Sequence, residues 1–143
     1  LGDTISNSKI HISASNLEQF RISVQLETSM SIQDEGPHLD LVNWKHCTTN
    51  WFMVENIAKH KFKLPNFDNI NLDCFPKVTI SEIKNAALEQ GGEHWVAVIE
   101  NNISNDYSPI SIDLSLVRIK VEQFVKSKWV LVTVLNIDVP LGC

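Results

Sequence analysis

The stretch FRISVQLE, residues 20–27, alternates strictly between apolar and polar residues. Because successive side chains of a β-strand point to opposite faces, a period of two predicts a strand with one buried face and one solvated face. The preceding KIHISAS also alternates, and a short polar segment, SNLEQ, separates the two stretches. This spacing predicts an antiparallel hairpin.

The C-terminal part of the chain predicts two longer strands, ISIDLSLVRIKVEQF and KWVLVTVLNIDV, with a hairpin turn at VKSK between them. In the first strand the apolar phase shifts between Leu116 and Val117, which a β-bulge would accommodate. The second strand, around Val130–Ile137, is apolar on both sides. We therefore expect it to lie centrally, in the same core as Phe20–Leu26 and covered on both faces.

Two segments have helical features. Residues 48–60 place apolar side chains at helical spacing after Thr48 or Thr49 as N-cap, and residues 81–90 follow Ser81 and end at a double glycine. HWVAVIE, residues 94–100, and HLDLV, residues 38–42, predict further strands. The expected fold class is α+β, a mostly antiparallel sheet of five or six strands with about two helices packed on one face. Residues 1–143 are expected to form a single globular domain.

Composition limits the classes of partner. The chain has 17 acidic and 12 basic side chains, a net charge of −5, so it would repel phosphate backbones and we expect no nucleic-acid ligand. It has no apolar run of membrane-spanning length, and we expect no membrane partner. Three cysteines leave one unpaired in any disulfide scheme, which indicates either a reducing compartment or thiols that are incidental, and we expect a cytoplasmic location.

A cysteine hydrolase is the strongest catalytic hypothesis. Cys47 would lie at the start of the predicted helix 48–60, where a helix dipole lowers the pKa of a thiol, and His94 would open a strand as the base. Asp106 or Asp113 would orient the imidazole. This order resembles that of papain-like peptidases, and GGEHWVAVIE is similar to their histidine strand, although no upstream glutamine completes an oxyanion hole. We favour a structural role for His94, without contact to Cys47.

Other chemistry has less support in the sequence. His38, Asp40, His46 and Cys47 are residue types that bind first-row metals, but their spacing matches no strong motif, so no metal site is predicted. The chain contains no Walker loop, GxGxxG, HExxH or GxSxG motif, and we expect no cofactor.

Acidic residues in predicted loops, with a tryptophan nearby, form a candidate protein-binding patch. Aromatic side chains often supply the binding energy of an interface, and charges accelerate the encounter. The candidate partner-binding residues are Asp34, Glu35, Trp44, Asp68 and Asp73. Further acids, Glu89 and Glu93, flank the double glycine.

The stretches DEGPHLDLVNWKH and VLNIDVPLGC, in an acidic α+β chain without a complete catalytic set, resemble bacterial immunity proteins of contact-dependent growth inhibition and related toxin systems. The resemblance implies a non-enzymatic inhibitor that binds and neutralises a cognate toxin domain, often a basic nuclease. Acidic loops facing a basic active-site cleft would be consistent with this role.

Overall fold

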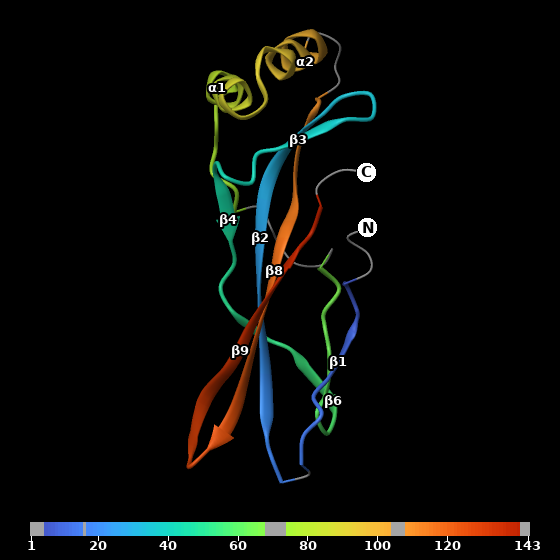
Figure 1. Ribbon diagram of the computed structural model, residues 1–143, viewed down its shortest axis with the longest axis vertical. Helices are drawn as coiled ribbons and strands as arrows, with labels where there is room; N and C mark the ends of the chain where they lie inside the picture. The colour runs from blue at the N-terminus through green and yellow to red at the C-terminus, as the bar shows by residue number, and fades with distance from the viewer. Residues whose placement is uncertain (1–4, 16, 68–73, 104–107, 141–143) are drawn as a thin grey trace. The chain divides into compact units, whose positions relative to one another are not determined.

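The computed structural model describes residues 5–15, 17–67, 74–103 and 108–140 (Figure 1). In this part of the chain, strands greatly outnumber helices. In chain order the elements are β1 (Lys9–His11), β2 (Phe20–Gln33), β3 (His38–Asp40), β4 (His46–Thr48), β5 (Phe52–Met53), β6 (Glu55–Ala58), β7 (Lys61–Lys63), α1 (Ile80–Gly91), α2 (Glu93–Ile103), β8 (Ile110–Val125) and β9 (Lys128–Asp138).

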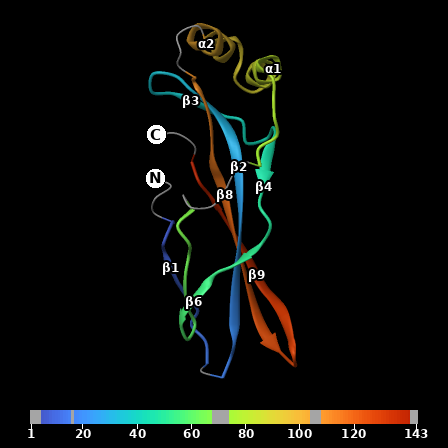
Figure 2. The ribbon, with the colours of Figure 1, turned by 180° about the vertical axis from the view of Figure 1, so that it is seen from behind.

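The larger of two sheets has six strands. Its main order is β3-β2-β8-β9, and the short strands β4 and β5 also pair with β2 (Figures 1 and 2). A three-stranded sheet has the order β1-β7-β6. The strand pairs β1–β7, β2–β3, β2–β4, β2–β5, β6–β7 and β8–β9 are antiparallel, so the α+β class with a mostly antiparallel sheet and two helices is confirmed.

The chain divides into two compact units. Unit 1 contains residues 1–26, 49–71 and 116–139, and unit 2 contains residues 27–48, 72–115 and 140–143. Strands β2 and β8 each contribute residues to both units. Because two strands are shared in this way, the division neither confirms nor contradicts a single domain, which stays a prediction.

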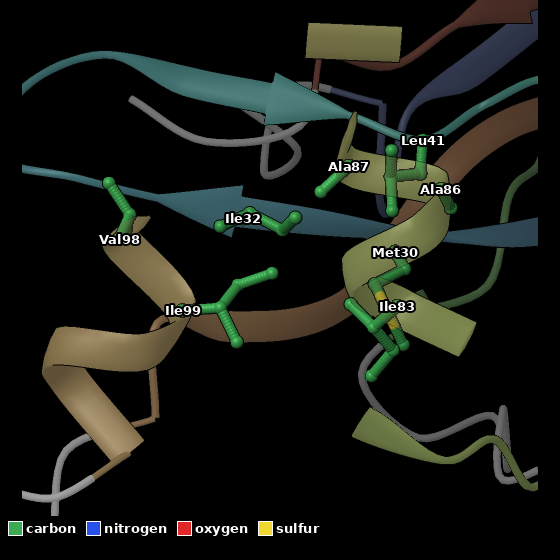
Figure 3. Close-up of a cluster of buried hydrophobic side chains, with 8 residues drawn as sticks. All are labelled: Met30, Ile32, Leu41, Ile83, Ala86, Ala87, Val98 and Ile99. Carbon is green, nitrogen blue, oxygen red and sulfur yellow. The ribbon is translucent and has the colours of Figure 1, made fainter. Parts of the chain in front are cut away.

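The core of unit 2 is formed by β2, the segment after β3, and both helices (Figure 3). It contains Met30, Ile32, Leu41, Ile83, Ala86, Ala87, Val98 and Ile99. All eight are small or apolar side chains, and Ile32, Leu41, Ala87 and Ile99 have no exposed surface. The helices therefore cover the part of β2 that lies in unit 2.

Helix α1 confirms the helix predicted near residues 81–90, although its N-cap is Thr79 and not Ser81. The Thr79 hydroxyl accepts from the Glu82 backbone N–H at 3.3 Å, and the Glu82 carboxylate accepts from the Thr79 N–H at 2.8 Å. This reciprocal pair is a capping box. Gly92, with φ of 87°, ends the helix in the left-handed region that glycine readily adopts.

The strand predicted for residues 94–100 is wrong, because these residues belong to helix α2. Trp95, Val98 and Ile99 pack on the core of unit 2, and their spacing of three and four residues is helical. The sequence contains enough β-favouring residues in HWVAVIE to suggest a strand. Packing against Ile32 and α1 decides in favour of the helix.

The helix predicted for residues 48–60 is also wrong, because this segment forms short strands: β4 and β5 pair with β2, and β6 pairs with β7. The Thr49 N–H donates to the Leu26 carbonyl at 2.9 Å, and the Val54 N–H donates to the Ile22 carbonyl at 2.9 Å. Of the apolar residues at helical spacing, only Val54 is buried. Backbone pairing with β2 therefore outweighs the local helical period.

The predicted hairpin between KIHISAS and FRISVQLE does not form, because β1 pairs with β7 instead. Ile10 lies opposite Phe62, which is buried, and the Ile12 N–H donates to the His60 carbonyl at 3.0 Å. The short strand predicted at HLDLV is confirmed as β3. Burying Ile10 against Phe62 explains the choice of partner.

The hairpin of β8 and β9 is confirmed, but two details of its prediction are wrong. Lys126 and Ser127 have φ of 46° and 65°, the conformation of a tight hairpin turn. The register shift lies between Val121 and Glu122, not near Leu116. Strand β9 lies at the end of the strand order and is exposed almost throughout, so it is neither central nor part of the core that buries Ile22.

Candidate functional site

Cys47 cannot act as a nucleophile in the form that the structure shows, because it is bonded to Cys74 in a disulfide. Cys47 lies on β4, opposite Thr28, and only 7% of the residue is exposed. A cysteine hydrolase needs a thiolate, and the predicted helix that would have lowered the pKa of the thiol is absent from this segment. The prediction of a reducing compartment assumed that all three cysteines are reduced, and the disulfide contradicts this assumption.

His94 lies in the first turn of α2 and is exposed. Its Nε2 is 3.3 Å from a carboxylate oxygen of Asp34, and its ring contacts Trp95 edge-on. No hydrogen bond joins His94 to Cys47 among the residues that the structure describes. Asp113, the candidate orienting carboxylate, is exposed on β8, and Asp106 lies outside the described residues. The described members of the catalytic hypothesis are thus not brought together.

The candidate partner-binding residues separate into three groups. Asp34 and Glu35 form the turn after β2, where the Asp34 carboxylate accepts from the Glu35 N–H at 2.9 Å. Trp44 packs against the core of unit 2, so it is not an exposed aromatic anchor. Asp68 and Asp73 lie outside the described residues. Of the candidates that the structure describes, the acidic turn is the part that stays available to a partner.

A second acidic segment joins this turn. The contact between His94 and Asp34 holds the turn beside the start of α2, where Glu93 is exposed. A Cβ atom on Gly91 would clash with side-chain atoms of Leu39 and Trp95, which shows how closely β3 approaches the helix junction. Acids that the sequence placed in separate loops thus meet on one surface. We call Asp34, Glu35 and Glu93 the acidic surface of unit 2.

Charge is distributed unequally between the two units. The residue ranges of unit 2 contain eleven acidic and three basic side chains, a net charge of −8. Those of unit 1 contain six acidic and nine basic side chains, a net charge of +3. The modest overall charge of −5 conceals this separation. Unit 2 is far more acidic than the whole-chain composition indicates.

Two of the three lysines of unit 2 are held in ion pairs. Lys45 Nζ lies 2.6 Å from Glu82, and Lys84 Nζ lies 2.8 Å from Glu100. The hydrogen bond from Lys45, together with those from Thr79, lowers the pKa of Glu82 to about 2. These lysines therefore neutralise acids of the helices and leave the acidic surface of unit 2 without their charge.

Unit 1 contains a charged cluster that the sequence analysis missed. Arg21 donates to both carboxylate oxygens of Glu122, from Nε at 2.8 Å and from Nη2 at 3.0 Å. The Arg21 hydrogen bond holds the pKa of Glu122 below its ordinary value. The Arg21 guanidinium lies 4.6 Å from the ring centre of Trp129, a cation–π contact. Alternation in both strands predicted outward-facing polar residues but not which ones would pair.

The second missed feature is apolar. Eight of the sixteen large hydrophobic side chains that are exposed in the described part of the chain lie between Phe124 and Leu135. Their exposed fractions range from 37% for Trp129 to 57% for Leu131. The sequence signal was visible as a strand apolar on both sides, but it was interpreted as a buried central strand.

Cavities and metal-binding groups add no further site. An open groove of about 360 Å³ in unit 1 is lined by residues that include Met53, Glu55, Lys63 and Asn66. Within the described ranges, no group of three or more His, Cys, Asp or Glu side chains is arranged to hold a metal ion.

Comparisons with protein-family models, with curated proteins and with solved structures find no match to this chain. No helix in the described residues combines the length and the apolar character needed to cross a bilayer. Any functional conclusion therefore depends on the residues themselves.

Proposed function

We propose that this chain is a non-enzymatic protein-binding module whose unit 2 meets a basic partner protein. The observation that carries the proposal is the net charge of −8 within unit 2, against +3 in unit 1. Such a concentration of one sign accelerates the encounter with a surface of opposite sign and repels nucleic acid. Because Glu35 and Glu93 are exposed on the acidic surface of unit 2, they are available to a partner.

The more specific form of the proposal is an immunity protein that neutralises a toxin domain. It is supported by the concentrated acidity of unit 2 and by the resemblance in DEGPHLDLVNWKH, which includes the acidic turn. A basic toxin cleft would be covered by this surface and its substrate excluded. The cysteine hydrolase is not carried further, since the Cys47–Cys74 disulfide leaves no thiol at Cys47.

The compartment is part of the same proposal. A cytoplasmic location stays a prediction, and the Cys47–Cys74 disulfide weighs against it, because disulfides persist mainly in oxidising compartments such as the bacterial periplasm. We therefore favour a partner that is met outside the reducing cytoplasm.

The proposal is tested by searching for a toxin-like reading frame beside the gene and co-expressing its product with this chain in a sensitive bacterium. We expect the chain to restore growth and to bind that protein, with an association rate that falls as salt rises. Glu35→Lys should slow association and reduce protection. Glu55→Lys is the matched control, because it makes the same charge change at an exposed glutamate of unit 1.

Two results would contradict the proposal. One is growth that the wild-type chain fails to restore although the chain is expressed and folded. The other is equal loss of protection in Glu35→Lys and Glu55→Lys, which would remove any special role for the acidic surface of unit 2.

A further inference from the structure

The end of the β8–β9 hairpin exposes eight large apolar side chains, distributed over both of its faces. Monomeric proteins rarely leave a contiguous apolar patch larger than roughly 300–600 Å² in water. The exposed residues of the hairpin are Phe124, Val125, Trp129, Val130, Leu131, Val132, Val134 and Leu135. A surface of this composition is typical of one that another chain covers.

The same strand also presents an open backbone edge. Strand β9 is the last in the order β3-β2-β8-β9, and it pairs with β8 on one side (Figure 1). Among the described residues, no strand pairs with its other side. An eleven-residue apolar edge strand is a template for pairing with a strand of another chain.

The register between β8 and β9 decides which side chains share a face. Thr133 lies opposite Val121 and Leu131 lies opposite Glu122, so Val132 is the extra residue of a bulge. On either side of the bulge the alternation resumes. Thr133 and Leu135 share the face of Val121, as does Val130, which lies opposite Gln123. Leu131 and Val134 share the opposite face, that of Glu122.

We propose that β9 pairs antiparallel with β9 of a second copy of this chain, about a two-fold axis at Thr133. Allowing for the bulge, Leu131 then lies beside Val134 of the second copy, and Val130 lies beside Leu135 of the second copy. Both pairs join apolar residues that share a face. A two-fold interface requires such a self-complementary strand.

The charges at the two ends of β9 favour the antiparallel arrangement. The strand begins at Lys128 and ends at Asp138, and both residues are exposed. Antiparallel pairing places the cationic end of one strand next to the anionic end of the other, twice in the dimer. Parallel pairing would place like charges together at both ends, which is unfavourable.

A strand of a different protein could also form hydrogen bonds with the open edge of β9. It would not have the apolar pairs and opposite end charges that two copies of β9 provide. The second copy is therefore the occupant that the sequence of β9 fits. The proposal is independent of the function proposed above, because β9 belongs to unit 1 and the acidic surface belongs to unit 2.

Sedimentation of the full chain over a range of concentrations tests the dimer. We expect the wild-type chain to shift from monomer to dimer as concentration rises, and Leu131→Lys to stay monomeric. Leu17→Lys is the matched control, since Leu17 is 95% exposed on the segment before β2, and this variant should dimerise like the wild type. A wild-type chain that is monomeric throughout, or a Leu131→Lys variant that dimerises normally, overturns the proposal.

Cross-linking in a Cys143→Ser background tests the register. Two Thr133→Cys residues at the axis would have Cα atoms roughly 4.5–5.5 Å apart, within disulfide range. Two Lys128→Cys residues would be roughly 30 Å apart at 3.3 Å per residue. We expect a cross-linked dimer from Thr133→Cys only. A cross-link from Lys128→Cys, or from neither variant, overturns the antiparallel arrangement.

Charge exchange gives a third measurement. Lys128→Glu and Asp138→Lys should each weaken the dimer, and the double variant should recover the wild-type dissociation constant. Lys61→Glu, at an exposed lysine of β7, changes the same charge and should have no effect. Failure of the double variant to recover dimerisation overturns the pairing of the strand ends.

Discussion

The two units differ in how much of the apolar surface of their strands is buried. In unit 2, helices α1 and α2 lie over β2 and leave Ile32 and Ile99 without exposed surface. In unit 1, no described helix contributes, and Leu131 and Val132 on β9 are more than half exposed. Of the sixteen large apolar side chains that are exposed in the described residues, the acidic unit 2 has four and the basic unit 1 has twelve. The comparison indicates that unit 1 is the part completed by association.

The largest expected difference between the two units comes from truncating a buried side chain in unit 2. We expect Ile99→Ala to lower the free energy of unfolding by about 2–5 kcal/mol, because the fully buried side chain leaves a cavity. Val134→Ala on β9, at concentrations where the chain is monomeric, should cost less than about 0.5 kcal/mol. Urea unfolding measures both. Similar losses for the two variants would show that β9 is packed as well as the core of unit 2.

The disulfide is the next largest contribution, and it belongs to unit 2 alone. Cys47 and Cys74 are 27 residues apart in sequence, so their bond restricts the unfolded chain and should stabilise the fold by about 2–4 kcal/mol. The variant Cys47→Ser with Cys74→Ser should lower the melting temperature accordingly. Adding a reductant should destabilise the wild type and leave the double variant unchanged. A reductant effect of equal size in both would assign the loss to another cause.

The N-cap of α1 makes a smaller contribution to the stability of unit 2. Thr79→Ala removes the hydroxyl of the capping box and should cost about 1 kcal/mol. Ser81→Ala is the matched control, because Ser81 is exposed within the helix and caps nothing in the structure. Chemical denaturation of the two variants measures the difference. A larger cost for Ser81→Ala would mean that the helix starts two residues later than the structure places it.

The smallest expected effect concerns acid and unit 1. The folded-state pKa of Glu122 lies below its ordinary value of 4.5, with the Arg21 hydrogen bond as the main cause. A depressed carboxyl pKa stabilises the fold above pH 4.5, and this contribution is lost as pH falls through the folded pKa. Glu122→Gln should therefore flatten the fall in stability below pH 4.5. Unfolding curves between pH 3 and 6 measure it, and an unchanged slope would contradict the assignment.

The local sequence pattern predicts a strand or helix correctly where the spacing of its apolar residues matches the secondary structure that forms. The alternation of Phe20–Leu26 identified β2, the double glycine located the end of α1, and VKSK located the turn before β9. It failed where a distant strand decides the outcome. Residues 48–60 have a helical period, but they form short strands that pair with β2 and β7.

The candidate site was predictable only in part, for related reasons. The acids at Asp34 and Glu35 were recognisable as an exposed loop, but their proximity to α2 depends on His94, which sequence assigned to a strand. The pairing of Cys47 with Cys74 was not deducible, because three cysteines allow several schemes. The exposure of β9 could not be predicted from its composition. An apolar strand is expected to be buried, but its sequence does not show whether its own chain or another chain buries it.

The long pairing of β2 with β8 has a consequence for the order of folding. Arg21 and Glu122 are 101 residues apart in sequence. Strand β2 therefore cannot pair with β8 until most of the chain has been synthesised. Sheets built from such distant pairs fold slowly, on the scale of milliseconds to seconds, because a long loop must close first. The β8–β9 hairpin is local and can form in roughly 1–10 μs. During synthesis on the ribosome, β2 is made early and stays unpaired along this edge until β8 has emerged.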